Sequence, residues 1–477
     1  MSLKIHFLHH HLEYFSKQLA SESDEHGERF HQVAMPMETR YKGKRLDSLV
    51  AEICWWSQKT YDPDNEDEEK EYTMGVSSED EDRSSSDTDS EQVGEPPRMK
   101  GSSVSCGQKG RFSKDFQDLR ASPQRFAENF RMQPEIFDEL FDILEPHLHR
   151  KRNTRPRDSI PEKAKLGIVL EYLASGDVQR HIASCYRISQ QDFGKIITKV
   201  CSAIVEAFKT EIPEWSEDNL KKFPDGFSDV WNFPNCVAAI DGKHVGIKAP
   251  RKSGSVFFNY KGFYSVVLLA TCDAVYKFTY VDVGAYGSEG DSNIFNNSKF
   301  GERILSDRCP FPSDTTIMGK RVPFFMVGDD AFPLCKRIMK PYSAKPLSPD
   351  ELSRARRCIE NAFGILSARW LCLRKVLFCS PDRAQIIIIA CCLLHNFLLR
   401  KSQSYCDNNF SGFEDTNRIW VHGEWEPLIL GDSFIQSNLP AFRGRATDYG
   451  KFIRNILKEY VNSESGSVPW QNSAAFV

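Results

Sequence analysis

The sequence has few closely spaced cysteines, which excludes a zinc ribbon or a disulfide framework as its organising feature. Its 14 cysteines are scattered, no CxxC pair occurs, and Cys391–Cys392 is the one close pair. Cysteines spaced in this way are typical of reduced, buried thiols. We therefore expect the chain in the reducing nucleus or cytosol.

Long apolar segments are also missing. The N-terminus, MSLKIHFLHHHLEYF, does not contain the apolar core of a secretion signal. The longest apolar run, IIIIACCLLHNFLL from Ile386, is shorter than the roughly 20 residues that cross a bilayer, and it contains His395 and Asn396. We interpret this run as a buried core helix and expect no membrane partner.

Charge is distributed unevenly over the 477 residues. The stretch from Asp62 to Glu91 holds 14 acids against Lys70 and Arg83, a local charge of −12. Because the whole chain carries −4, the remainder carries +8. A basic remainder suits a polyanionic partner such as DNA.

The first 210 residues divide by composition into three parts. Residues 1–60 are predicted to form a small helical segment whose role the sequence does not reveal. Residues 61–110 are acidic and rich in Ser, so they cannot bury enough apolar surface to order themselves, and we interpret them as a disordered linker. Residues 111–210 are predicted to be helical, because Phe126, Phe130, Ile136, Leu140 and Leu144 recur at helical spacing until Pro146.

The end of this helical region has a helix-turn-helix outline. One helix is predicted to end at Gly176, a short second helix follows, and Ser189 is predicted to cap a third. The polar side of the third helix would carry Gln190, Gln191, Lys195 and Lys199, which suit contacts with bases and phosphates. A structural subdomain with a solvated basic face remains the alternative.

A basic segment, HRKRNTRPR, lies between the helices of this region. Its cations either contact DNA phosphates, direct nuclear import or form a solvated linker. The candidate DNA-binding residues in it are Arg150, Lys151, Arg152, Arg155 and Arg157.

From residue 225 the pattern changes to that of an α/β domain, which we place at 225–400, followed by a partly ordered C-terminal tail, 401–477. NCVAAID, HVGIKA, YSVVLLATCD, FTYVDVGAYG and VPFFMVGDD are predicted strands. LSRARRCIENAFGILSARW and RAQIIIIACCLLHNFLL are predicted helices.

Acidic residues stand at the ends of these elements. Asp241 closes one apolar strand, Asp329 and Asp330 close another, and Glu360 lies on a helix. Each has an ordinary structural explanation, such as a turn cap or a pair between Glu360 and Arg356. Carboxylates that converge at one sheet edge would instead bind two divalent ions about 3.5–4 Å apart.

Several motifs in order resemble the PIF/Harbinger transposases and their domesticated nuclease relatives. They are WNFPNCVAAIDGKHVGIKAP, FFNYKGFYSVVLLATCDAVYKF, YGSEGDSNIF, VGDDAFPL and RRCIENAFGILSARW, with ENFRMQPEIFDEL upstream and LLHNFL downstream. The resemblance covers about 125–400. It implies an RNase H-like DDE catalytic core, metal-dependent DNA endonuclease or strand-transfer chemistry, and two Mg²⁺ or Mn²⁺ ions.

The resemblance also implies site residues. The family motifs place the catalytic, metal-binding acids at Asp241, Asp329 and Glu360, with Asp330 as the fallback for Asp329 and Asp291 as a supporting carboxylate. Lys248, Lys252 and Lys261 are candidate phosphate contacts just beyond Asp241. His244 is interpreted as a structural residue. Relatives commonly act with a separate Myb/SANT-like DNA-binding protein, which makes such a protein a candidate partner here.

The sequence thus predicts a nuclear DNA endonuclease or transposase. Two alternatives stay open: a catalytically silent DNA-binding or adaptor protein on a transposase scaffold, and a hydrolase of small phosphoesters. The sequence does not reveal the target DNA or the oligomeric state.

Overall fold

A computed structural model describes residues 111–148, 160–342, 353–414, 420–429 and 446–468. These residues all belong to Met99–Val477, the second of two units into which the chain divides. The predicted N-terminal segment, 1–60, and the acidic linker, 61–110, lie outside the described residues. So does the basic segment that contains Arg150, Lys151, Arg152, Arg155 and Arg157.

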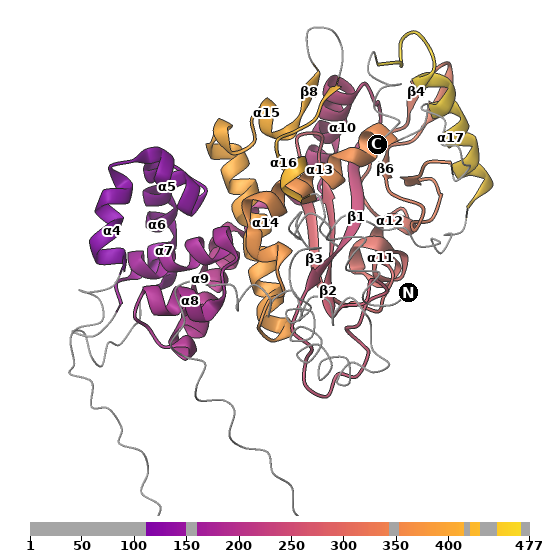
Figure 1. The fold of residues 1–477 in the computed structure, drawn as a ribbon. Coiled ribbons are helices and arrows are strands. Elements are labelled where there is room, and N and C mark those ends of the chain that lie inside the picture. Colours follow the sequence, from indigo (N-terminus) through magenta and orange to yellow (C-terminus); the bar gives the residue numbers. More distant parts are fainter. Residues whose placement is uncertain (1–110, 149–159, 343–352, 415–419, 430–445, 469–477) are drawn as a thin grey trace, which may run out of the picture. The chain divides into compact units, whose positions relative to one another are not determined.

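The first described part is helical (Figure 1). An aromatic cluster of Phe116, Phe126, Phe130 and Phe137, with ring centroids 4.6–6.3 Å apart, joins its first three helices. Edge-to-face and tilted rings at this spacing are favourable packing partners. The helices are α4 (Arg111–Arg120), α5 (Pro123–Phe130), α6 (Pro134–Leu148), α7 (Glu162–Ser175), α8 (Gln179–Cys185) and α9 (Gln190–Phe208).

Two of the predicted helix boundaries are confirmed and one is wrong. Helix α7 ends at Gly176, which has a left-handed backbone (φ 60°), and the Ser189 side chain accepts a hydrogen bond from the Asp192 amide at the start of α9. Pro146 does not end α6, which continues to Leu148. The last turn keeps its helical form because Leu144 and Leu148 are both fully buried on the core side.

A five-stranded mixed sheet follows, so the predicted α/β class is confirmed. Its strand order is β3-β2-β1-β6-β7. Strand β1 is antiparallel to β2, β2 is antiparallel to β3, and β1, β6 and β7 are mutually parallel. The strands are β1 (Cys236–Gly246), β2 (Ser265–Cys272), β3 (Phe278–Tyr286), β6 (Phe325–Val327) and β7 (Ile338–Met339); β4 (Thr315–Ile317) and β5 (Lys320–Val322) form a separate hairpin.

The two strands predicted at NCVAAID and HVGIKA are one strand, β1. Pairing with β2 continues without a break through Asp241, Gly242 and Lys243, opposite Ala270, Leu269 and Leu268. A continuous partner strand therefore overrides the glycine as a break signal, and Asp241 lies within the strand rather than at its end.

Helices cover both faces of the sheet (Figure 1). From Ala239 onward, alternate β1 side chains enter opposite cores: Ala239 and Val245 lie in the larger one and Ile240 in the smaller. The larger core is shared with α13 (Ser353–Arg369), α14 (Pro381–Lys401) and η5 (Leu371–Arg374). The smaller one is shared with α11 (Asp291–Asn297) and α12 (Lys299–Leu305), while α10 (Glu217–Trp231) contributes to both.

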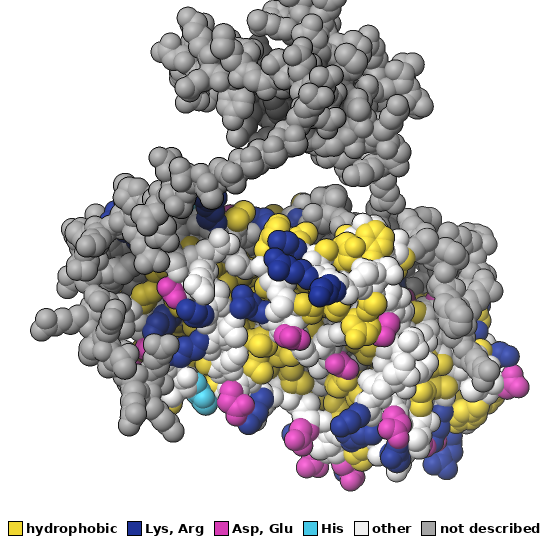
Figure 2. Space-filling view, turned by 90° about the horizontal axis from the view of Figure 1, so that it is seen from below, with side chains coloured by type: hydrophobic (Ala, Val, Ile, Leu, Met, Phe, Trp, Pro, Cys, Tyr) yellow, Lys and Arg dark blue, Asp and Glu magenta, His cyan; other side chains and the backbone are white. Residues whose placement is uncertain are grey.

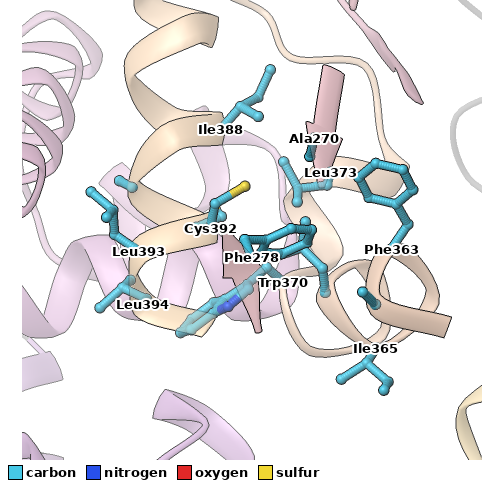
Figure 3. Packing of buried hydrophobic residues seen from close by; sticks show 14 of the residues in the cluster. Ala270, Phe278, Phe363, Ile365, Trp370, Leu373, Ile388, Cys392, Leu393 and Leu394 are labelled. Carbon is cyan, nitrogen blue, oxygen red and sulfur yellow. The ribbon is translucent and has the colours of Figure 1, made fainter. Parts of the chain in front are cut away.

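Helix α14 is the predicted core helix. It has 21 residues, longer than the apolar run inside it, and by length and composition it could span a membrane. However, 67% of its most apolar window is buried inside the protein. Figure 3 shows Cys392 of α14 on the side of the helix that faces Phe278, with Leu393 on the opposite side; both belong to the larger core. All cysteines among the described residues are free.

The polar pair within α14 ties the helix to strand β3. Asn396 is fully buried; its amide accepts a hydrogen bond from Phe278 N (2.8 Å) and donates to Phe278 O (2.8 Å) and Glu211 O (3.1 Å). The neighbouring His395 bonds Tyr405 and the Tyr276 carbonyl, and burial lowers its pKa to about 4. The LLHNFL motif therefore has a structural role.

The described C-terminal residues pack against α13, α14 and β7. They form η6 (Gln403–Tyr405), α15 (Asn408–Ser411), a hairpin of β8 (Phe413–Glu414) and β9 (Trp420–Val421), α16 (Trp425–Ile429) and α17 (Asp448–Val461). Trp425 lies directly against Gly364 of α13: a Cβ at Gly364 would come within 2.1 Å of the Trp425 ring. Helix α13 therefore needs glycine at this position.

We predict that Asn396→Leu destabilises the protein by about 3 kcal/mol, because the amide and carbonyl of Phe278 and the carbonyl of Glu211 would lose their buried partners. Urea unfolding followed by circular dichroism measures the change. Asn296→Leu, on the exposed side of α11, is the matched control and should stay within about 0.5 kcal/mol of the wild type. Equal effects of the two substitutions would contradict the role assigned to Asn396.

Candidate active site

The β1–β6 register places two acids side by side. Ala239 of β1 pairs in parallel with Val327 of β6. Asp241 and Asp329 each lie two residues further along their chains, and neighbouring strands are about 4.8 Å apart. The Asp241 side chain accepts a hydrogen bond from Gly242 N (2.8 Å), and that of Asp329 accepts one from Ala331 N (2.9 Å).

Glu360 comes to the same place from α13, which covers β1. By strand alternation, Asp241 points to the face of the sheet on which α13 lies. Glu360 accepts a hydrogen bond from Arg356, one helical turn earlier. The pairing that the sequence offered as the ordinary explanation of Glu360 is thus present, and it lies within the acid cluster.

Asp291 reaches the opposite side of the same strand. It begins α11, and its carboxylate packs against the backbone of Gly242: a Cβ at Gly242 would lie 2.0 Å from Asp291 Oδ1. Any residue larger than glycine would displace this carboxylate. Gly242 is therefore required by close approach.

The four acids influence one another. Burial, followed by the charges of Asp329, Asp291 and Glu360, raises the pKa of Asp241 well above its usual range. Burial and the charge of Asp329 raise the pKa of Asp291 to about 7. Burial likewise raises the pKa of Asp329, with the Ala331 amide and Arg356 acting in the opposite direction. The negative charges of the four acids are therefore not fully balanced by the groups around them.

Residues 240–396, which contain all four of these acids, match the family model described as DDE superfamily endonuclease. The chain is 25% identical over 326 residues to "Protein ALP1-like" of Arabidopsis thaliana, a match covering 64% of this chain and 78% of that protein. It is 26% identical over 283 residues to "Putative nuclease HARBI1" of Homo sapiens, covering 57% and 77%. No solved structure matches.

The DDE superfamily endonuclease match and the relatives named ALP1-like and HARBI1 support a resemblance to the Harbinger-type DDE family. The resemblance stated from the motifs is thereby confirmed.

The sequence did not place two basic residues of the DDE domain among the acids. Arg356 lies among the acids, and the charges of Glu360, Asp241 and Asp329 outweigh its burial and raise its pKa. Lys243 follows Asp241 on the same face of β1, and burial lowers its pKa to about 8 despite the nearby acids. The only available sequence signals were the i, i+4 spacing to Glu360 and the i, i+2 spacing to Asp241.

The predicted lysines differ in their proximity to the acids. Lys261 is close enough for the charges of Asp241 and Asp291 to act on it, although burial lowers its pKa. Lys248 and Lys252 are exposed, and Lys252 has a left-handed backbone (φ 61°). Asp330 lies beside Asp329, and its main-chain carbonyl accepts a hydrogen bond from Lys340 (3.0 Å).

Some of the predicted DNA-contact residues of α9 make contacts within the protein. Gln190, Gln191 and Lys195 are exposed, and Lys195 pairs with Asp192 at 3.1 Å. Lys199 is half-buried, donates to the Leu148 carbonyl and pairs with Glu162 at 3.5 Å. Lys199 therefore stabilises the contact between α6, α7 and α9, which sequence spacing could not show.

His244 occupies a buried position on β1. Its Nδ1 lies 2.9 Å from Ser265 Oγ, and burial lowers its pKa to about 4, so the ring is neutral. A neutral ring held by a serine fits the structural role predicted for His244.

We predict that the acid cluster makes the metal-free protein less stable as pH rises. Asp291 binds its proton until about pH 7 in the folded state and until about 3.8 at its ordinary value. Between these values the folded state holds more protons than the unfolded state, so stability falls with rising pH. Asp291→Asn should reduce this loss by on the order of 1–3 kcal/mol, or roughly 2–8 °C, between pH 5 and 8. Asp241 and Asp329, whose pKa values are also raised, should keep their part of it.

Thermal unfolding in EDTA at several pH values measures the difference. Asp282→Asn, an acid on β3, is the control and should keep the wild-type slope. A wild-type slope in Asp291→Asn as well would show that Asp291 is not the group responsible.

Proposed function

We propose that the protein is a nuclear, metal-dependent DNA endonuclease or transposase whose catalytic acids are Asp241, Asp329 and Glu360. The observation that carries the proposal is the β1–β6 register, which sets Asp241 beside Asp329 at the point where α13 brings Glu360. Resemblance to a DDE endonuclease family with relatives named as nucleases supports the reaction class.

The strand order supports an RNase H-like core. In the sheet, three consecutive strands run antiparallel, and the two later strands lie parallel to the first on its far side. In this arrangement the first strand is central and carries Asp241, and its parallel neighbour leads directly to Asp329.

The donor set fits divalent cations. Among the described residues, no group of three or more His, Cys, Asp or Glu is arranged ready to hold a metal ion, and Arg356 bonds Glu360 instead. The acids nevertheless supply only oxygen donors in a half-buried, mutually repelling cluster, which is the environment that hard cations such as Mg²⁺ and Mn²⁺ favour. Endonucleases of the DDE superfamily generally use divalent metals.

These contacts suggest a role for each group in the proposed reaction. Bound divalent cations would supply Lewis acidity and an activated oxygen for in-line attack on a phosphodiester. Asp241, Asp329 and Glu360 would hold these cations. Asp291, which packs against the Gly242 backbone on the opposite side of β1, would be a supporting carboxylate. Arg356 bonds only Oε1 of Glu360, so Oε2 could serve as a ligand while the guanidinium stays beside the site and contacts a DNA phosphate. Lys261, and Lys248 and Lys252 on the neighbouring surface, would neutralise other phosphates.

DNA would also be positioned by the helical region. Helices α7, α8 and α9 follow one another with short turns, and α9 begins with the exposed Gln190, Gln191 and Lys195. Gln side chains suit adenine edges and Lys suits phosphates. A Myb/SANT-like partner remains part of the proposal by family resemblance.

The proposal predicts divalent-dependent nicking of supercoiled plasmid by the full-length protein with Mg²⁺ or Mn²⁺. Asp241→Asn, Asp329→Asn and Glu360→Gln should each reduce the rate by about a thousandfold, because each removes a ligand. Asp330→Asn is the matched control and should keep near wild-type activity. Gel electrophoresis of the plasmid, with EDTA as a blank, measures the rates.

Metal-induced thermal stabilisation gives a second measurement that does not need cleavage. Mn²⁺ should raise the melting temperature of the wild type and of Asp330→Asn, but not of Asp241→Asn. DNA binding without metal-induced stabilisation and without nicking would reject the nuclease and favour the adaptor alternative.

We predict a phosphate contact for Lys195. Lys195→Ala should weaken binding to duplex DNA and reduce the slope of log K against log salt by about 1. Lys209→Ala is the matched control, because Lys195 and Lys209 are both 66% exposed and each pairs with an acid three residues earlier. Fluorescence anisotropy over a salt series measures both. Identical slopes for the two variants would remove α9 from the DNA-binding surface.

A further inference from the structure

A tight turn in the loop between β1 and β2 presents an aromatic and a basic side chain next to the acids. Asn259 is buried, and its side-chain oxygen accepts hydrogen bonds from Lys261 N (3.0 Å) and Phe263 N (3.2 Å). Its backbone closes the turn through Gly262 N to Asn259 O (3.1 Å). The Tyr260 side chain, at the tip, is 52% exposed.

The turn is anchored to the strand that carries Asp241. Asn259 Nδ2 donates to Ser265 Oγ (2.9 Å), and the same hydroxyl lies 2.9 Å from His244 Nδ1. The Tyr260 ring meets the His244 ring edge-to-face, with centroids 5.4 Å apart. His244 is three residues beyond Asp241 on β1. The exposed ring is therefore held in place relative to the acids by buried hydrogen bonds.

Charge around the ring favours a nucleic acid. Lys261 Nζ lies 5.7 Å from the Tyr260 ring centroid. The Tyr260 hydroxyl is close enough to Asp291, Asp241 and Asp329 that these acids, after burial, help to raise its pKa. Val256 and Phe258 of the same loop are also exposed. Figure 2 shows the lower side of Figure 1, where hydrophobic side chains lie directly beside Lys and Arg.

We propose that Tyr260 is a nucleobase-stacking site that receives an unpaired base of the DNA strand at the acid cluster, while Lys261 contacts the adjoining phosphate. Base faces in the interior of a duplex are covered by their neighbours, so away from the duplex ends an exposed ring stacks only on a base that has left the helix. The inference rests on the proposed function and narrows its substrate to DNA with a locally unpaired nucleotide. It also assigns the FFNYKGF motif a role beyond holding the sheet.

The test compares two fluorescein-labelled duplexes, one fully paired and one with a short bulge of unpaired thymines. Full-length protein carrying Asp241→Asn binds each in Ca²⁺, and anisotropy gives the two dissociation constants. The bulged duplex should bind more tightly by about 5- to 100-fold. Adding Tyr260→Ala should abolish this preference while leaving affinity for paired DNA unchanged, and Tyr260→Phe should retain it.

Tyr449→Ala is the matched control, because Tyr449 is a tyrosine of similar exposure (44%) on α17. It should keep the full preference. Thermal unfolding checks that Tyr260→Ala remains folded. A preference that is equal in the Asp241→Asn protein and in the same protein with Tyr260→Ala, or absent from both, overturns the inference.

The outcome is separable from that of the proposed function. Binding is measured without cleavage, so a Tyr260-dependent preference in a protein that never nicks plasmid would support the stacking site and reject the nuclease. Nicking by the wild type without a Tyr260-dependent preference would support the nuclease and reject the stacking site.

Discussion

Two parallel strands in fixed register determine the chemistry available to this protein. Because Ala239 pairs with Val327, the residues that follow bring two carboxylates together where β6 ends beside the central strand β1. A one-residue slip would turn one of them to the opposite face. The helices that cover the sheet fix this register by burying the alternate residues on both sides. The same register therefore determines both the packing of the core and the position of the acids.

The same constraint creates an electrostatic problem that the fold only partly relieves. Three carboxyl groups, Asp241, Asp291 and Asp329, have raised pKa values because they are buried near one another. Arg356 and Lys243 are placed among them, and both come from the elements that deliver the acids, α13 and β1. A site of this kind is poised for added positive charge, whether from cations or from the ordering of its own basic side chains around a phosphate.

Local signals in the sequence were enough for some features and not for others. The glycine that ends α7 and the serine that caps α9 act on their own helices, so their effects could be predicted. Gly242 could not be interpreted locally, because its role depends on Asp291 from a helix about 50 residues away, and the pairing with β2 carries the strand through it. Arg356 was visible only as a partner of Glu360. Its proximity to Asp241 and Asp329 depends on how α13 crosses the sheet.

The contact between Trp425 and Gly364 extends the functional unit beyond the DDE domain match, which ends at residue 396. Helix α13 carries Glu360, and its outer side is covered by a helix from the last quarter of the chain. A premature stop codon near residue 400 would leave every candidate acid in the product yet expose this side of α13. Inheritance of such a truncated allele should therefore resemble loss of the whole gene, although all the motifs that define the family would still be encoded.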